Sequence, residues 1–133
     1  MQRDDECWLI SVQPDGMPLV KLRGKNRVVQ LVGITVPQPV SDAYLEVLQR
    51  VQQANRTLYC ISMADDQEGV LRAKLLYYGW HDKTGDVWQD LALLLIDEGV
   101  VEVAGEDFPG KDVYVEHAAA ARHRRARETG GPS

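Results

Sequence analysis

Four basic residues recur at every second position in one short stretch of this chain. They are Lys21, Arg23, Lys25 and Arg27. On an exposed strand, such a row would follow the phosphates of a nucleic-acid backbone, and Arg72 and Lys74 on a later strand would lie beside it. The alternative, which we favour, is a solvated edge whose charges prevent aggregation between strands. The row remains a candidate binding surface, although we favour the solvated edge.

Carboxylates are missing from the stretch that contains this row. From Gly16 through Ser41 there is no Asp or Glu. A hard cation such as calcium requires oxygen ligands, preferably anionic ones, and this stretch supplies none. The three histidines are scattered and have no Cys or His partner at metal-ligand spacing. Asp65, Asp66 and Glu68 in the acidic loop expected at 64–69 could hold a surface cation, but we favour a solvated loop. We therefore expect no metal site and no cofactor.

The tryptophans are the residues best suited to stacking against nucleic-acid bases. They stand at Trp8, Trp80 and Trp88. Stacking requires an aromatic ring that is exposed beside positive charge. Among the three tryptophans, only Trp80 shows weak signs of such surroundings in the sequence. We interpret all three as packing residues of the core or its rim.

Charge is unevenly spread over the 133 residues. The net charge is −5, residues 111–133 carry +2 and the remainder carries −7. An acidic body disfavours general binding to nucleic acid, because that affinity comes largely from neutralised phosphates. The arginines at 122–127 either contact an acidic partner or complement a helix C-terminus, and we favour the helix interpretation.

Hydrophobic periodicity predicts a β-meander followed by mixed strands and helices. Strands are expected at residues 7–13, 19–23, 27–34, 57–63 and 70–78, with turns at 14–16 and 24–26. Helices are expected within 41–54 with Ser41 as N-cap, from Asp86 as N-cap to about residue 98, and over 112–127. This order predicts an α+β, mainly β, fold in which five strands close as an OB barrel with three helices.

Several pieces of the sequence match one known pattern, in order. They are Asp15-Gly16 with 19–22, the stretch 28–38, the loop 66–69, the stretch 86–101 and an Ala- and Arg-rich closing helix. With these pieces the chain resembles the thermonuclease family, whose members have a staphylococcal-nuclease-like OB fold. The most specific pieces are L-x-G-I-x-x-P at 31–37 and the stretch that ends at Gly99. The matched pieces cover about residues 7–128, and we expect one domain over residues 1–128. The Gly-rich end at 129–133 is expected to be a flexible tail.

The resemblance also implies where a metal ion would bind. Active members of the family hold one calcium ion with two aspartates and a backbone carbonyl. On this chain the first aspartate falls on Met17 or Pro18, the second on Thr35, and the carbonyl residue is Val36. No carboxylate remains for the metal, so the resemblance implies that calcium-dependent cleavage is lost.

The remaining family residues act on the phosphate. The family's glutamate falls on Gln38, one of its arginines on Gln30 and the other on Val70. Arg72 lies two residues after Val70 and so on the same face of the strand, and it could replace Val70 if the alignment were shifted by two residues. No such shift restores the metal ligands. The resemblance therefore implies a degenerate active site at Gln30, Thr35, Gln38 and Val70, with no catalytic residue.

Taken together, the sequence predicts a non-catalytic binding module and leans against an enzyme. Its partner is expected to be a protein or, weakly and with strong salt dependence, a single-stranded nucleic acid. The expected binding residues are Lys21, Arg23, Lys25, Arg27, Arg72 and Lys74. The alternative is a nuclease or phosphodiesterase of the thermonuclease class with a rebuilt, divergent site. Because no membrane span, signal peptide or disulfide framework is recognisable, we expect a cytoplasmic protein with free cysteines.

Overall fold

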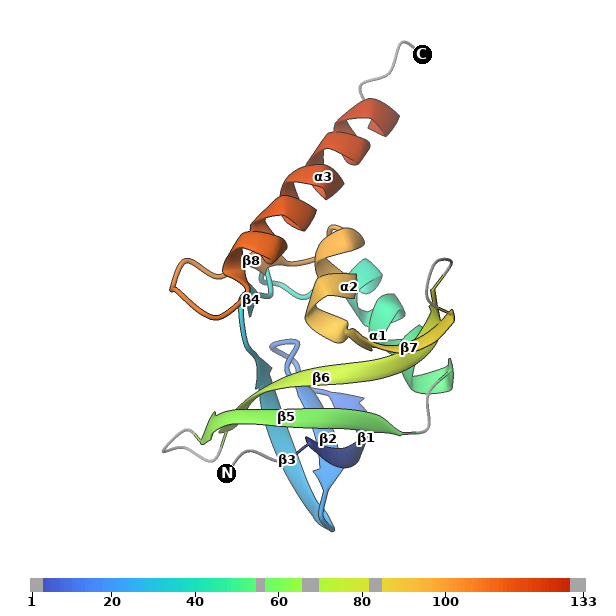
Figure 1. Cartoon of the computed structure of the whole chain (residues 1–133), viewed down its shortest axis with the longest axis vertical. Coiled ribbons are helices and arrows are strands. Elements are labelled where there is room, and N and C mark those ends of the chain that lie inside the picture. The colour runs from blue at the N-terminus through green and yellow to red at the C-terminus, as the bar shows by residue number, and fades with distance from the viewer. Residues whose placement is uncertain (1–3, 55–56, 66–69, 82–84, 130–133) are drawn as a thin grey trace.

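The computed structural model describes residues 4–54, 57–65, 70–81 and 85–129 (Figure 1). In these residues five strands close into a barrel around which three helices are arranged. The barrel strands are β1 (Asp4–Val12), β2 (Pro18–Leu22), β3 (Lys25–Leu31), β5 (Leu58–Asp65) and β6 (Val70–His81). The predicted α+β barrel class is confirmed.

The barrel closes because its first and last strands meet. Hydrogen bonds join the strands in the order β3-β2-β1-β5-β6, and β3 then pairs in parallel with β6. Alternate residues point inward, so Leu9, Val20, Val29, Leu71 and Leu75 are buried in the core. The residues between them form the outer face of the barrel.

Two tight turns fix the register of the meander. In the first, at residues 14–16, Gly16 has φ +95° and its N–H donates to the carbonyl oxygen of Gln13 at 2.8 Å. This confirms the turn predicted there. The second turn consists of Arg23 and Gly24, both at positive φ (53° and 78°), as a two-residue hairpin turn requires. The turn predicted at 24–26 is therefore wrong, since Lys25 and Asn26 already belong to β3.

Helix α1 (Asp42–Ala54) begins where the sequence predicts. The backbone N–H of Tyr44 donates to Ser41 Oγ at 3.1 Å, which confirms Ser41 as the N-cap. The helix buries Tyr44, Val47, Leu48 and Val51 against the barrel.

The second helix is shorter than predicted. Residues expected in its first half form a strand instead, β7 (Gly85–Asp90), which extends the sheet by pairing with the long strand β6. Helix α2 (Leu91–Asp97) begins after Asp90, whose Oδ1 accepts from the N–H of Ala92 at 2.9 Å. Asp86 as N-cap is therefore wrong. Pairing with β6 satisfies the backbone of 85–90, and the strongest apolar run starts only at Leu91.

Helix α3 (Lys111–Thr129) packs on α2, and its C-terminal part extends away from the barrel (Figure 1). Its buried residues Tyr114 and Ala121 face the body of the protein. A short ladder of β4 (Ile34–Thr35) and β8 (Glu102–Val103) joins the end of the meander to the segment before α3. The third predicted strand is interrupted here at Gly33, where φ is +93°.

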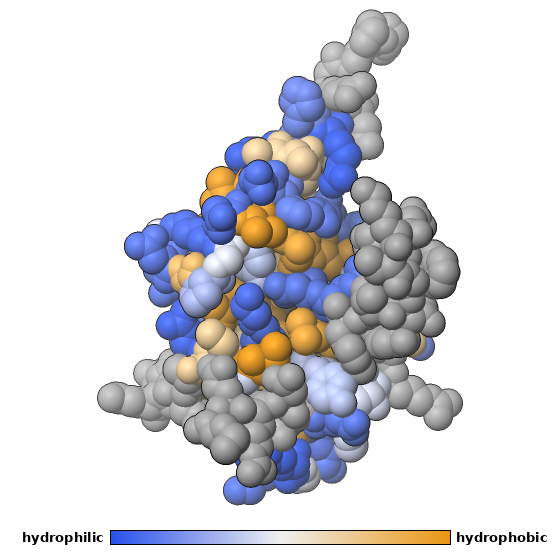
Figure 2. Space-filling model, viewed as in Figure 1, coloured by the Kyte–Doolittle hydropathy of each residue, from blue (hydrophilic) through white to orange (hydrophobic). Residues whose placement is uncertain are grey.

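The expected tail at 129–133 lies almost entirely outside the described residues, and Thr129 still belongs to α3. No described helix is long and apolar enough to cross a membrane. On the face shown in Figure 2, hydrophobic residues lie in small patches between hydrophilic ones.

Candidate functional site

One pocket gathers most of the positions that the resemblance assigns to an active site. Its volume is about 390 Å³. It lies between the 14–16 turn, strand β3 and the segment leading to α1. Its lining includes Asp15, Met17, Gln30, Thr35 and Gln38, and further Gly16, Pro18, Val29, Leu31, Ile34, Val36 and Tyr44. Val70 is not among the lining residues, because it pairs with Val28 further along β3.

Gln38 is a structural clamp in this pocket. Its Nε2 donates to the carbonyl oxygen of Asp15 at 2.7 Å and to that of Val36 at 3.2 Å. These bonds tie the 14–16 turn to the segment after β4. An amide can make them because its nitrogen is a donor, whereas a carboxylate has only acceptors. The side chain at the position where the resemblance places a glutamate is therefore an amide, which cannot act as a carboxylate base and which holds two loops together.

Tyr44 of α1 also holds the 14–16 turn through a hydrogen bond. Its hydroxyl donates to the carbonyl oxygen of Gly16, and Asp15 Oδ1 accepts from the N–H of Met17 at 3.0 Å. Burial, and secondarily the carboxylate of Asp15, raises the pKa of Tyr44. Its hydroxyl therefore stays protonated and remains a donor at neutral pH. A Cβ at Gly16 would stand 2.9 Å from Val36 Cγ1, so the turn fits closely against the pocket wall.

The pocket has little charge with which to bind a phosphate. Asp15 is the one charged residue among those that line it, and no lysine or arginine is among them. Its other walls are mainly aliphatic, with Gln30 and Thr35 as polar groups. A developing phosphate charge requires fixed donors or cations, which this lining lacks. The pocket suits an uncharged, largely apolar group.

The two cations predicted on β6 are engaged elsewhere in the molecule. Arg72 Nη2 donates to Glu106 Oε1 at 3.0 Å, and Lys74 Nζ lies 5.5 Å from the centroid of the Tyr114 ring. Both partners belong to the segment that enters α3 or to α3 itself. These side chains help hold residues 106–114 against the barrel.

The row of four cations on the β2–β3 hairpin does not share one face. Lys21 lies opposite Asn26, whereas Arg27 lies opposite the buried Val20. Cross-strand partners point to the same side of a sheet, so Lys21 is on the outer face and Arg27 on the inner side. The two-residue turn reverses the parity, which the spacing in the sequence conceals. A stripe on a single face is therefore wrong.

The β6 cations are also distant from this row. Arg72 pairs with Gln30, and Gln30 is four residues along β3 from Asn26, the partner of Lys21. At about 3.4 Å per residue this separates the two places by roughly 14 Å. The structure thus divides the six predicted binding residues into a hairpin group and a β6 group. Their binding of any partner stays a prediction.

Trp8 is an exposed residue that the sequence interpretation assigned to packing. The side chain is 49% exposed and lies directly across from Lys21 on the outer face. The alternation of β1 already contained this signal, because Cys7 and Leu9 on either side point inward. The side chains of Trp80 and Trp88 lie outside the described part of the protein.

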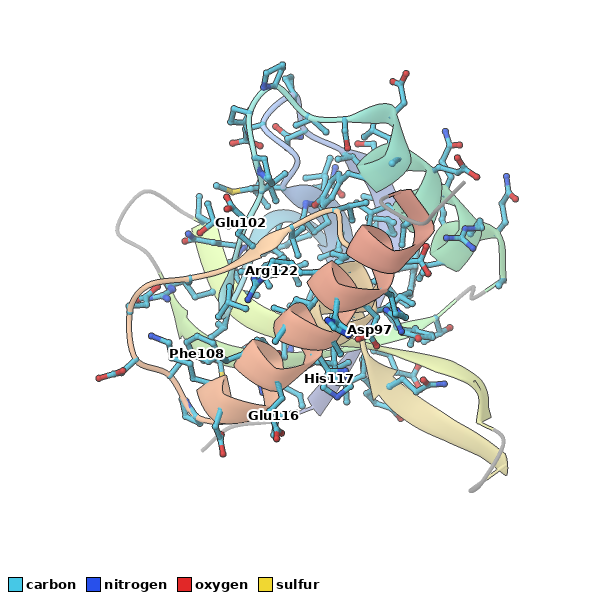
Figure 3. The ribbon with its side chains drawn as sticks, turned by 90° about the horizontal axis from the view of Figure 1, so that it is seen from above. Asp97, Glu102, Phe108, Glu116, His117 and Arg122 are labelled. Atoms are coloured by element: carbon cyan, nitrogen blue, oxygen red, sulfur yellow. The ribbon has the colours of Figure 1, made fainter. Side chains whose placement is uncertain are left out.

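A second pocket, of about 360 Å³, lies beside α3. Its lining residues come from α2, residues 99–103 and α3, and include Glu102 and Arg122 (Figure 3).

On another side of α3, His117 Nδ1 lies 2.7 Å from Asp97 Oδ1 (Figure 3). Arg124 donates to the carbonyl oxygen of Asp97 at 2.7 Å. This last bond satisfies the C-terminal end of α2, so one arginine of the basic helix end complements a helix C-terminus.

The described residues contain no cluster of three or more His, Cys, Asp or Glu side chains arranged to hold a metal ion. Cys7 and Cys60 are both buried, and neither forms a disulfide. Of the acidic loop predicted at 64–69, Ala64 and Asp65 belong to β5 instead, and residues 66–69 lie outside the described residues.

Comparison with protein-family models finds no match, and a search of curated proteins finds no matching relative. The fold and the geometry of these sites are therefore the basis for assigning a function to this chain.

Proposed function

We propose that this chain is a non-catalytic member of the staphylococcal-nuclease-like OB-fold class and acts by binding a protein partner. The observation that carries the proposal is the clamp made by Gln38. At the position where the family has a carboxylate, this chain uses a side-chain amide whose hydrogen donors are directed at two carbonyl oxygens.

The barrel supports assignment to this class. A three-stranded meander is followed by α1 and two further strands, and β3 closes on β6. The positions expected around an active site converge on one pocket between the first turn and the segment before α1. One segment counts against the assignment, since residues 85–90 form a strand where the resemblance placed the start of a helix.

The chemistry of the pocket lining supports the proposal that the chain is not catalytic. Its one carboxylate, Asp15, accepts from the N–H of Met17, and no cation lines the pocket. Hydrolysis of a phosphodiester needs an activated nucleophile and stabilisation of phosphate charge, and these side chains offer neither. An uncharged group of a partner is the better occupant.

A protein partner is favoured over nucleic acid by the distribution of cations. Nucleic-acid binding requires several positive side chains along one track, whereas the hairpin cations are divided between two faces. Arg72 and Lys74 are engaged with residues 106–114. Exposed Trp8 and Ile10 instead provide the kind of apolar surface that protein interfaces use.

A cleavage assay tests the proposal. Highly purified protein is incubated with single-stranded DNA, duplex DNA and RNA, with and without millimolar calcium, beside an active thermonuclease as positive control. We expect no cleavage. The matched variant is Thr35→Ala, which alters the pocket at an exposed position without touching the Gln38 bonds. Cleavage by the natural chain that this variant abolishes would establish the rebuilt nuclease instead.

A binding titration with single-stranded DNA at several salt concentrations tests the choice of partner. Four phosphate contacts would give a slope of log K against log salt of about −3, at roughly −0.7 per contact. Because the four cations do not share a face, we expect a shallower slope and weak binding. A slope near −3 with tight binding would favour the nucleic-acid function.

A further inference from the structure

Two stretches of the chain have four cations and no carboxylate: the β2–β3 hairpin and residues 117–127 of α3. The stretch from Gly16 through Ser41 contains four cations and no carboxylate. The rest of the chain then has 11 of the 15 Lys and Arg residues and all 20 Asp and Glu residues, a net charge of −9. Figure 1 shows that this hairpin projects from the barrel at the end opposite α3. An acidic group approaching the protein is therefore attracted to this end.

Beside the hairpin lies an apolar surface that no described element covers. We call it the meander face and define it by the apolar residues Trp8 and Ile10 on β1, Leu19 on β2 and Val28 on β3. Lys21 lies at its edge. Trp8 is 49% and Ile10 38% exposed, and Leu19 and Val28 are half-buried cross-strand partners. The inward residues of the same strands fill the barrel core, so these side chains alternate outward as the pleat requires.

Lys21 connects the apolar surface with the charged one. It lies between Trp8 on β1 and Asn26 on β3, is exposed, and makes no ion pair with another described residue. Arg23 stands in the adjoining turn, also exposed. A large aromatic ring and an exposed cation thus lie next to one another at the edge of the meander face.

We infer that the meander face docks an acidic segment of a partner protein, with a bulky apolar side chain of that segment against Trp8 and a carboxylate on Lys21. The inference deepens the proposed function and depends on it, since it names the surface and the chemistry of the partner. Aromatic residues surrounded by polar groups are the usual energetic centres of protein interfaces. The excess of positive charge in the hairpin supplies the complementarity to a negative segment.

A nucleic acid fits this surface less well. Lys25 and Arg27 are on the other side of the hairpin from Lys21, so successive phosphates on one track would meet few cations. Glu6 is exposed on the same side of β1 as Trp8, two residues away, and repels any anion there. An extended row of phosphates would meet this repulsion, whereas a peptide can keep its carboxylate at Lys21. A peptide needs only one or two carboxylates near Lys21 and can place its apolar side chains on Trp8 and Ile10.

The experiment uses the full chain and a fluorescein-labelled synthetic peptide of alternating glutamate, leucine and phenylalanine, followed by fluorescence anisotropy. The same peptide with lysine in place of glutamate and an oligothymidylate serve as alternative probes. The test variants are Trp8→Ala and Lys21→Glu. Val115→Ala and Arg122→Glu on α3 are matched controls, because Val115 is 45% exposed and Arg122 is also exposed. Circular dichroism establishes that each variant is folded.

We expect saturable binding of the acidic peptide that weakens about tenfold or more in Trp8→Ala, in the range of an interface hot spot. Lys21→Glu should weaken it severalfold and reduce its salt dependence. Binding unchanged in the test variants, or equally weakened in the α3 controls, would overturn the docking surface but leave the non-catalytic module intact. No saturable binding of the acidic peptide, or tighter binding of the lysine peptide or oligothymidylate, would overturn the partner chemistry. Failure of the proposed function is read separately, from cleavage of nucleic acid.

Discussion

Gln38→Glu is the substitution that most directly separates a structural clamp from a lost catalytic base. It restores the residue type that the resemblance places at this position and changes the side chain by one group. In the structure Nε2 is 2.7 Å from the Asp15 carbonyl oxygen and 3.2 Å from that of Val36. A carboxylate there would place acceptors against acceptors, with the Asp15 carboxylate nearby. We expect a less stable protein that still does not cleave nucleic acid.

The size of the effect follows from the two bonds. Each hydrogen bond contributes about 0.5–1.5 kcal/mol net, and Gln38 is exposed, so the lower part of this range applies. The loss of both bonds with added repulsion predicts a decrease in the free energy of unfolding of about 1–2 kcal/mol at pH 7. At roughly 4 °C per kcal/mol for a domain of this size, the melting temperature falls by about 4–8 °C.

The pH dependence distinguishes repulsion from simple loss of contact. Neighbouring oxygens raise the pKa of the introduced carboxyl above its unfolded value of about 4.3. Its stabilising neutral form is fully present below that unfolded value and is lost as pH rises through the folded pKa. Relative to the natural chain, Gln38→Glu should therefore recover stability on acidification, whereas Gln38→Ala should not.

Urea unfolding at pH 7 and near pH 4 measures these differences. Gln49→Glu on the exposed side of α1 is the matched control and should have little effect at either pH. An unchanged midpoint for Gln38→Glu at pH 7, or a larger deficit at low pH, would refute the clamp. Calcium-dependent cleavage gained by this variant would refute the proposal that the site is degenerate beyond one residue.

Three further predictions concern the turn, the tyrosines and metal. Gly16→Ala should lower the free energy of unfolding by about 1–3 kcal/mol, because φ is +95° and the new Cβ meets Val36 Cγ1 at 2.9 Å; Gly105→Ala, with open space around it, should be near neutral by the same urea titration. Burial and the hydrogen bond to Asp90 raise the pKa of Tyr114, so its stabilising contribution is complete below the unfolded value of about 10 and is lost as pH rises through the folded pKa. Stability measured between pH 8 and 11 should therefore decline less steeply in Tyr114→Phe than in the natural chain, and an equal decline would exclude this origin. Millimolar calcium should leave the melting temperature unchanged, and an increase of several degrees that a chelator abolishes would reveal a metal site.

The outline of the fold could be predicted because it depends on local chemistry. Alternation of apolar residues marked the meander, and Ser41 marked the start of α1 through its side-chain oxygen. The start of α2 could not be read in the same way. Asp86 and Asp90 are both acceptable caps, and pairing with the long strand β6 made 85–90 a strand and left the cap to Asp90.

The candidate site divides along the same line. The sequence by itself determined that no carboxylate occurs between Gly16 and Ser41, and that uncharged side chains occupy the positions where the resemblance implies charge. Only the tertiary structure decided what those side chains do. The side-chain N–H of Gln38 donates to the carbonyl oxygen of Asp15, 23 residues away in the sequence, because the fold brings the 14–16 turn beside the segment that leads to α1. A two-residue turn likewise placed Lys21 and Arg27 on opposite faces, since facing across a hairpin is set by cross-strand register and not by spacing along the chain.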